Sequence, residues 1–335
     1  SSPADNATAV AVDSNLGLNF SEAVEVKTGN ISIKKTSDNS TVETIDVTSS
    51  QVAGSGTTQI TINPTSNFDS STAYYVQIDA TALDDSSGNS YAGISDTTSL
   101  SFTTADVVAP SLSSSSPADN ATAVAVDSNL GLNFSEAVDV KTGNISIKKT
   151  SDNSTVETID VTSNQVTGSG TSQITINPSA DFDSSTAYYI QIDVTALDDS
   201  SGNSYAGISD TTSLSFTTAD VIAPSLSSSS PADNATDVSI SANIVLNFSE
   251  AVDVKTGNIT LYKTSDNSVV ETIAVDSSQV TGSGTNQITI NPSTDLDYST
   301  SYYVQLDTTA FDDPSNNSYA GISDTTSFSF TTAAT

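Results

Sequence analysis

The chain has 335 residues and a formal net charge of −32, with 40 acidic residues against eight Lys and no Arg. Cys, His, Met and Trp are absent, which excludes disulfides, thiolate zinc sites, cysteine nucleophiles and Ser-His-Asp triads. The negative charge opposes binding to nucleic acid or to an anionic membrane surface, and no apolar run is long enough to cross a bilayer.

One sequence unit occurs three times. The segment Pro3–Thr8 returns at Pro117 and at Pro231, a period of 114 residues that never slips in register. This period is an ordinary domain size, and each copy is long enough to bury its own core. We therefore predict three domains, at residues 1–108, 109–222 and 223–335. There is no initiating Met and no signal peptide, so we expect the chain to be a piece of a longer protein.

Within the first copy, apolar residues alternate with small or polar ones, as in Tyr74, Val76 and Ile78. Strict alternation is typical of strands with one buried face, and no stretch shows a helical stripe. Turn residues such as Gly54-Ser55-Gly56 separate the strands. About seven short strands per copy favour an all-β fold of three tandem immunoglobulin-like β-sandwiches forming an elongated rod. Six of the expected strands lie at about 15–20, 30–35, 41–47, 59–63, 74–80 and 99–104.

A tyrosine pattern precedes the penultimate strand of each copy. Phe68, Thr72 and Tyr74 recur with the same spacing in the second copy, and the third copy has Leu in place of Phe. A Tyr at this position is similar to the tyrosine corner of immunoglobulin-like sandwiches, in which the hydroxyl bonds to nearby backbone. We expect Tyr74 and its two equivalents to form such corners.

Four further segments carry a family resemblance over the whole length of each copy. They are Ser-Pro-Ala-Asp-Asn-Ala-Thr, Asn19–Val24, Leu83–Asn89 and Ser101–Thr104. Together they resemble bacterial immunoglobulin-like domains of the type repeated in S-layer proteins and in large surface adhesins, including calcium-dependent RTX adhesins. The resemblance implies an extracellular spacer on a bacterial surface, with calcium at the domain junctions. No Gly-Gly-x-Gly-x-Asp nonapeptide and no sugar-binding or ice-binding tip is present, so the chain resembles a stalk, of the kind that also supports biofilms.

Acidic residues should cluster at the two predicted junctions. In immunoglobulin topology the linker residue Asp106 should face two loops of the following copy, with Asp69 approaching from the preceding copy. Calcium prefers six to eight oxygen ligands, mainly carboxylates and carbonyls. Adjacent carboxylates repel each other unless a cation lies between them. The candidate ligands at the first junction are Asp106, Glu136, Asp139, Asp198 and Asp199. Those at the second junction are Asp220, Glu250, Asp253, Asp312 and Asp313.

Other interpretations of the same residues stay open. Asp and Asn are ordinary turn residues, so these loops could simply be solvated. Paired carboxylates such as Asp84 and Asp85 can serve glycosidases, but no apolar pocket or Trp platform is indicated, so we expect no enzyme. The alternative function is a glycan- or protein-binding module of an S-layer or secreted carbohydrate-active protein. We expect a monomer whose partners are its own neighbouring repeats, with no nucleic acid and no membrane insertion.

Overall fold

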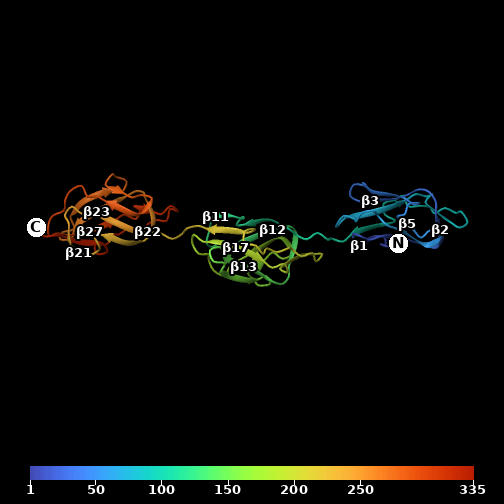
Figure 1. Ribbon diagram of the computed structural model, residues 1–335, viewed down its shortest axis with the longest axis horizontal. Helices are drawn as coiled ribbons and strands as arrows, with labels where there is room; N and C mark the ends of the chain where they lie inside the picture. The colour runs from blue at the N-terminus through green and yellow to red at the C-terminus, as the bar shows by residue number, and fades with distance from the viewer.

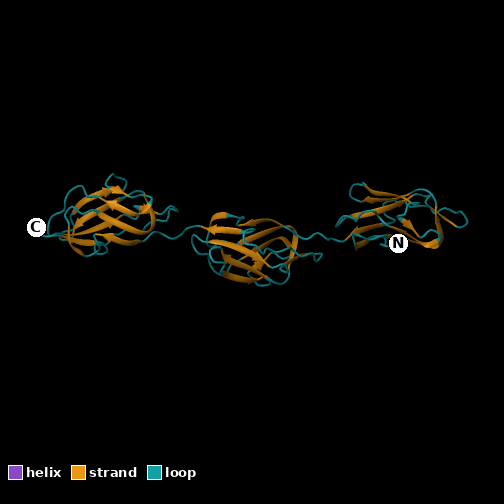
Figure 2. Ribbon diagram, in the orientation of Figure 1, coloured by secondary structure: helices purple, strands orange, loops and turns teal.

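The computed structural model describes residues 1–335 and shows three separate bodies in a row, joined by short linkers (Figure 1). Every regular element is a strand (Figure 2). No helix is present that has the length and apolar character needed to cross a membrane. The prediction of an all-β fold with three tandem sandwiches is therefore confirmed.

Each body is a sandwich of two facing sheets. In the middle repeat one sheet has the order β11-β19-β17-β13-β14, and the other has the order β10-β12-β16-β15 with β18 also pairing with β12. All pairs in this repeat are antiparallel except β11 with β19, which is parallel. Its strands are β10 (Leu112–Ser116), β11 (Ala121–Val124), β12 (Leu130–Val140), β13 (Asn144–Lys149), β14 (Thr155–Asp160), β15 (Val166–Thr167), β16 (Thr171–Ile176), β17 (Ala187–Ile192), β18 (Leu197–Asp199) and β19 (Ser215–Thr218).

The outer repeats have the same topology, with one difference in the first. Strand β10 has a counterpart in the third repeat, β20, but the first repeat has only a single bridge, between Ser2 and Gly17. The first repeat contains β1 (Ala7–Val10), β2 (Leu16–Val26), β3 (Asn30–Lys35), β4 (Thr41–Asp46), β5 (Val52–Ala53), β6 (Thr57–Ile62), β7 (Ala73–Ile78), β8 (Leu83–Asp85) and β9 (Ser101–Thr104). The third contains β20 (Leu226–Ser230), β21 (Ala235–Val238), β22 (Ile244–Val254), β23 (Asn258–Lys263), β24 (Val269–Ala274), β25 (Val280–Thr281), β26 (Thr285–Ile290), β27 (Ser301–Leu306), β28 (Phe311–Asp312) and β29 (Ser329–Thr332).

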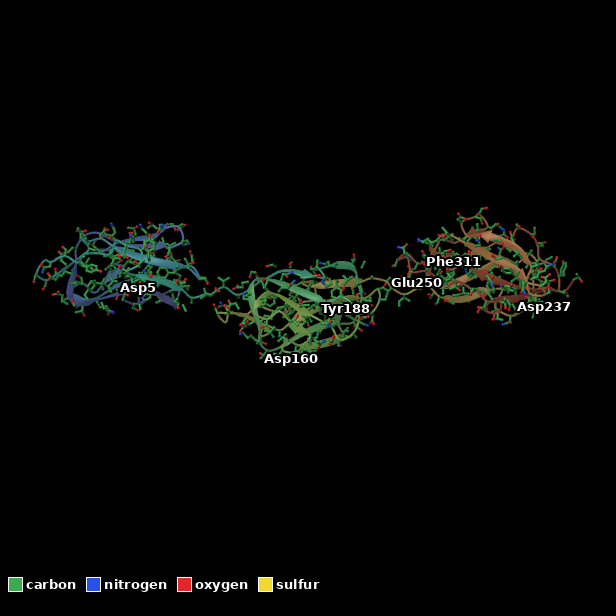
Figure 3. All side chains as sticks on the ribbon, turned by 180° about the vertical axis from the view of Figure 1, so that it is seen from behind. Asp5, Asp160, Tyr188, Asp237, Glu250 and Phe311 are labelled. Atoms are coloured by element: carbon green, nitrogen blue, oxygen red, sulfur yellow. The ribbon has the colours of Figure 1, made fainter.

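Each repeat has its own hydrophobic core, made by the alternating side chains of both sheets. The tyrosine corners close one end of it. The hydroxyl of Tyr188 accepts a hydrogen bond from the backbone N–H of Asp183 at 2.8 Å, and the equivalent bonds to Tyr74 and Tyr302 are 2.9 Å long. These bonds confirm the predicted corners. Figure 3 labels Tyr188 inside the middle repeat.

One expected strand is longer than its alternation suggested. The strand predicted over residues 15–20 continues to Val26 as β2, because Val24 and Val26 keep one apolar face pointing at the core. The short strand β8 then pairs with this extension, with Val26 opposite Leu83. Segments expected as loops at the junction end of each repeat are therefore sheet, and this fixes the direction of their acidic side chains.

Candidate metal sites at the junctions

Three carboxylates converge at each junction. Oxygen atoms of Asp106, Glu136 and Asp199 lie within 4.8 Å of one another, and those of Asp220, Glu250 and Asp313 do the same at the second junction. In each trio one acid comes from the linker and two come from the repeat that follows. Figure 3 shows Glu250 at the end of the third repeat that faces the linker, whereas Asp237 lies towards the opposite end.

The linker acid is held by the repeat that precedes it. The Ser70 hydroxyl donates to Asp106 Oδ1 at 2.9 Å, and the Val108 N–H donates to the same oxygen at 3.1 Å. Ser70 Oγ also accepts a hydrogen bond from the Val107 N–H at 2.9 Å. These contacts use Oδ1 only, so no protein donor occupies Asp106 Oδ2.

The most buried acid of the first trio is Asp199, which is 2% exposed. Its Oδ1 accepts the backbone N–H groups of Ser201 and Asn203, each at 2.8 Å. Burial disfavours its charge, but the hydrogen bonds from Asn203 and neighbouring backbone outweigh burial and place the pKa of Asp199 below its usual range. The tight turn after β18 therefore keeps this carboxylate ionised inside the junction.

Asn203 also connects the two repeats. Its side-chain amide donates to Asp199 Oδ2 at 2.7 Å and to the backbone carbonyl of Asp106 at 3.2 Å. One side chain of the second repeat thus contacts both an acid of its own repeat and the linker. The linker and the second repeat are therefore joined by a direct hydrogen bond, next to the negatively charged trio.

Glu136 points to the trio because of strand periodicity. It lies two residues before the buried Val138, which is opposite Asp199 in the pairing of β12 with β18, so all three side chains share one face. Burial raises the pKa of Glu136, and the negative charges of Asp106 and Asp199 raise it further. No hydrogen-bond donor of the protein offsets this repulsion, so Glu136 is the acid of the trio with the strongest preference for a cation or a proton.

The second junction repeats this arrangement. Its buried acid, Asp313, is fully enclosed, and Asn317 bridges it to the backbone carbonyl of Asp220 with bonds of 2.8 and 3.2 Å. The Ser184 hydroxyl donates to Asp220 Oδ1 at 3.0 Å. Burial, followed by the charges of Asp220 and Asp313, raises the pKa of Glu250. The two junctions thus present the same set of carboxylates and the same supporting hydrogen bonds.

The structure does not bring four of the expected ligands into the trios. Asp139 and Asp198 are paired opposite each other one position along β12 and β18, so they project from the other face of the sheet. There Asp139 lies 3.4 Å from the Lys141 ammonium. Asp253 and Asp312 are paired in the same way at the second junction, and the Asp253 carboxylate lies 3.9 Å from the Lys255 ammonium.

Sequence reasoning missed the supporting polar residues. Asp69, expected to approach the junction, instead forms an ion pair with Lys35 at 2.6 Å, and its neighbour Ser70 contacts the linker acid. Ser70 and Asn203 look like ordinary turn residues, and only their return at a period of 114 could have singled them out. In the third repeat the positions of Ser70 and Asp106 are occupied by Tyr298 and Ala334. The third repeat therefore has neither the hydroxyl nor the carboxylate that these two positions supply at the junctions.

Comparisons with known proteins identify the repeated unit. A family model described as the bacterial Ig-like domain matches residues 1–104, 106–218 and 220–332. A search of curated proteins found no match. The similar solved structures include the extracellular domains 3–5 of Drosophila OTK, at 7% identity and a TM-score of 0.23, covering 99% of this chain and 95% of that one.

Two other similar structures have bacterial surface titles. The S-layer protein rSbsC(31-844) is 11% identical with a TM-score of 0.22, over 99% of this chain and 54% of that one, so this chain spans about half of its length. The BSP domain of a biofilm associated protein is 12% identical with a TM-score of 0.19, over 99% of this chain and 66% of that one. Identities and TM-scores this low add nothing to the family match.

Proposed function

Because the chain belongs to the bacterial Ig-like domain family, with three copies in a row, we propose that it is a structural spacer. In this proposal it is a stalk segment of a large bacterial cell-surface adhesin of the RTX type, with domains at residues 1–108, 109–222 and 223–335. Calcium stiffens its two junctions, and the stalk holds a distal ligand-binding region away from the cell. Its role is mechanical and not catalytic.

The observation that carries this proposal is the carboxylate trio that joins each linker to the next repeat. All of its donors are carboxylate oxygens, which suit a hard cation such as calcium. Calcium–oxygen distances are about 2.3–2.6 Å, so ligands on opposite sides of one ion lie about 5 Å apart. Oxygen atoms within 4.8 Å of one another fit that sphere. Further carboxylate oxygens and water would complete the six to eight ligands.

The linker geometry explains how such a site would stiffen the rod. Asp106 is held by Ser70 at one end of the linker, and Pro110 is buried at the other. Between them Val107, Val108 and Ala109 are all exposed, the two valines by 54% and 57%, so this part of the linker has little packing to hold it. A cation shared by Asp106, Glu136 and Asp199 would hold the two ends of this short segment together.

The remaining parts of the proposal concern partners and location. We propose that the chain is a monomer on the outside of a bacterial cell, that neighbouring repeats are its partners, and that it neither binds nucleic acid nor inserts into a membrane. The charge of −32 supports this, because it opposes anionic surfaces and favours solubility. A glycan array with the whole chain distinguishes this role from a binding module, since a spacer should show no saturable binding.

Small-angle scattering with and without a calcium chelator tests the stiffening. We expect the calcium-loaded chain to keep a sharply defined maximum dimension, and the chelated chain to show a broader distance distribution because both hinges loosen. A matched control is the same comparison on Glu136→Gln/Glu250→Gln, for which the two curves should coincide. An unchanged distribution for the natural chain would contradict the proposal.

The raised pKa values of Glu136 and Glu250 predict opposite effects of pH with and without calcium. Both values lie above the ordinary 4.5 in the assembled junction. Without metal, the assembled junction binds a proton more tightly than the loosened one, so it is favoured as pH falls through the raised pKa and disfavoured above it. With calcium, the proton competes with the ion, so affinity falls over the same window.

Calorimetric titration of calcium from neutral pH to about pH 5, with scattering of the metal-free chain at each pH, measures both trends. The double variant Glu136→Gln/Glu250→Gln should weaken both dependences, which separates these two groups from the remaining acids. If acidification strengthens calcium binding, or loosens the metal-free junctions, the assignment of Glu136 and Glu250 is wrong.

A further inference from the structure

Two tyrosine rings stack on the outer face of the third repeat. Tyr262 of β23 lies directly opposite Tyr303 of β27 in the antiparallel pairing of these strands, which Figure 1 labels. The ring centroids are 4.8 Å apart, and the ring planes differ by 7°. Both side chains alternate with buried core residues, Leu261 and Tyr302, so they point away from the core. The sheet itself therefore holds the two phenol rings against each other.

The first two repeats keep one member of this pair and lack the other. Tyr75 and Tyr189 occupy the position of Tyr303, and each lies opposite a lysine, Lys34 or Lys148. In all three repeats the hydroxyl of this tyrosine donates to an Asn of the neighbouring hairpin, at 3.1, 3.1 and 3.3 Å. Among the aromatic contacts of the whole chain, only the pair in the third repeat joins two tyrosines.

The composition of the chain directs oxidation towards tyrosine. The sequence has 11 Tyr and no Cys, Met, Trp or His. Thiols and thioethers are the side chains that oxidants attack first. Because these groups and the indole of Trp are missing, the phenols of tyrosine are the most readily oxidised side chains in this protein. A radical formed on one tyrosine cannot pass to a sulfur or an indole of the same chain, so it persists until it meets a second phenol.

We propose that Tyr262 and Tyr303 form a site of oxidative cross-linking, at which hydrogen peroxide and a peroxidase couple the two rings into dityrosine. Each phenol loses one electron and one proton and becomes a phenoxyl radical. The two radicals form a carbon–carbon bond between ring positions ortho to the hydroxyls, and the ortho hydrogens move to the oxygens, which restores both phenols. The protein loses two hydrogen atoms overall. One peroxide takes up the two electrons and two protons and becomes two water molecules.

The position of the pair favours a bond within the repeat. Tyr303 is only 4% exposed, whereas Tyr262 is partly exposed, so the oxidant meets Tyr262 first. Coupling inclines the parallel rings to each other, and the open side of Tyr262 leaves room for this movement.

The bond would join two inner strands of the sheet β21-β29-β27-β23-β24. It would close a loop of about 40 residues, and a cross-link of that size stabilises a fold by restricting the unfolded chain. The site is separate from the carboxylate trios and does not need calcium. It would therefore add a covalent reinforcement of one repeat to the spacer role.

Treatment of the whole chain with peroxide and a peroxidase, in the presence of a calcium chelator, tests the proposal. We expect the blue fluorescence of dityrosine to appear together with the loss of two hydrogen atoms per chain. Trypsin cuts the denatured chain after Lys255 and Lys263, so the two tyrosines fall in separate peptides, 256–263 and 264–335. After oxidation these peptides should be recovered as one species. In calorimetry the third repeat should melt about 10 °C higher.

Two substitutions in the third repeat give matched controls. Tyr262→Phe should abolish the joined peptides, whereas Tyr298→Phe, which removes a tyrosine that is 50% exposed, should leave them unchanged. A third variant transfers the site to the second repeat. Lys148→Tyr places a second ring opposite Tyr189 and should create the same cross-link there, joining peptides 142–149 and 150–255.

Several results would overturn the proposal. Peptide 256–263 could stay free while dityrosine forms elsewhere, or the same joined peptides could form equally well in the urea-unfolded chain, which would show that the fold does not direct the coupling. Covalent dimers through Tyr298, without a bond inside the third repeat, would mean that exposed tyrosines couple at random. A third repeat that melts at a lower temperature after coupling would contradict the reinforcing role.

Discussion

Replacing Glu136 with Gln is expected to abolish calcium binding at the first junction and to leave the second junction unchanged. Calcium affinity depends strongly on the number of charged ligands, and loss of groups that merely support a ligand already costs about 10–100-fold. Loss of a ligand should therefore weaken the site by about 100-fold or more. Glu136 makes no hydrogen bond to the protein, so the substitution removes a charge without breaking the fold. The number of calcium ions bound per chain, measured by calorimetric titration, should fall from two to one.

The control for this experiment lies three residues further along the same strand. Asp139→Asn makes the same change of charge, but its side chain projects from the opposite face, beside Lys141. It should retain two calcium ions with nearly unchanged affinity. Equal losses from Glu136→Gln and Asp139→Asn would mean that the chain attracts calcium through its overall charge alone, and the junction site would have to be abandoned.

The largest loss of stability is expected from Gly168→Ala. Gly168 has a positive φ of 99°, and an added Cβ would lie 2.0 Å from the carbonyl oxygen of Gln173. Because backbone on both sides would have to move, we expect the second repeat to lose about 3 kcal/mol or more. The turn also supports the junction, since the Gly170 N–H donates to the Val138 carbonyl at 2.8 Å and the Val140 N–H donates to Ser169 Oγ at 3.0 Å.

Differential scanning calorimetry of the whole chain measures this effect. About one third of the unfolding enthalpy should move to a lower temperature, by roughly 10 °C or more for a domain of this size. Gly202→Ala is the matched variant, because it also has a positive φ, of 89°, but its added Cβ would meet nothing within 4 Å. It should cost about 1 kcal/mol. Identical scans for the two variants would contradict the assigned clash.

The sequence predicted the fold well because strand periodicity and turn chemistry are local signals. The alternation in Tyr74, Val76 and Ile78 and the glycine turns located the sheets, and the period of 114 located the repeats. The junction was only partly predictable. Asp106, Glu136 and Asp199 do meet, but choosing them over Asp139 and Asp198 required the pairing of β12 with β18. That pairing was hidden because the end of β12 is rich in acids and looked like a loop.

The supporting residues Ser70 and Asn203 could not be predicted from the sequence, for a different reason. The contact of Ser70 with Asp106, and that of Asn203 with the Asp106 carbonyl, join segments from opposite sides of a linker. No local pattern marks such contacts, since Ser and Asn are common in any turn.

The parallel pairing of β11 with β19 has a consequence for a chain under tension. These strands lie near the two ends of the middle repeat's sequence, and hydrogen bonds join them at both ends, from Asn120 N–H to the Ser215 carbonyl and from Ala219 N–H to the Val124 carbonyl, each 2.7 Å long. Pulling the termini apart draws parallel neighbours in opposite directions along their length. The bonds are then strained together by sliding and do not open one after another as a zipper does. Flow or drag along the rod would meet its greatest resistance in that geometry.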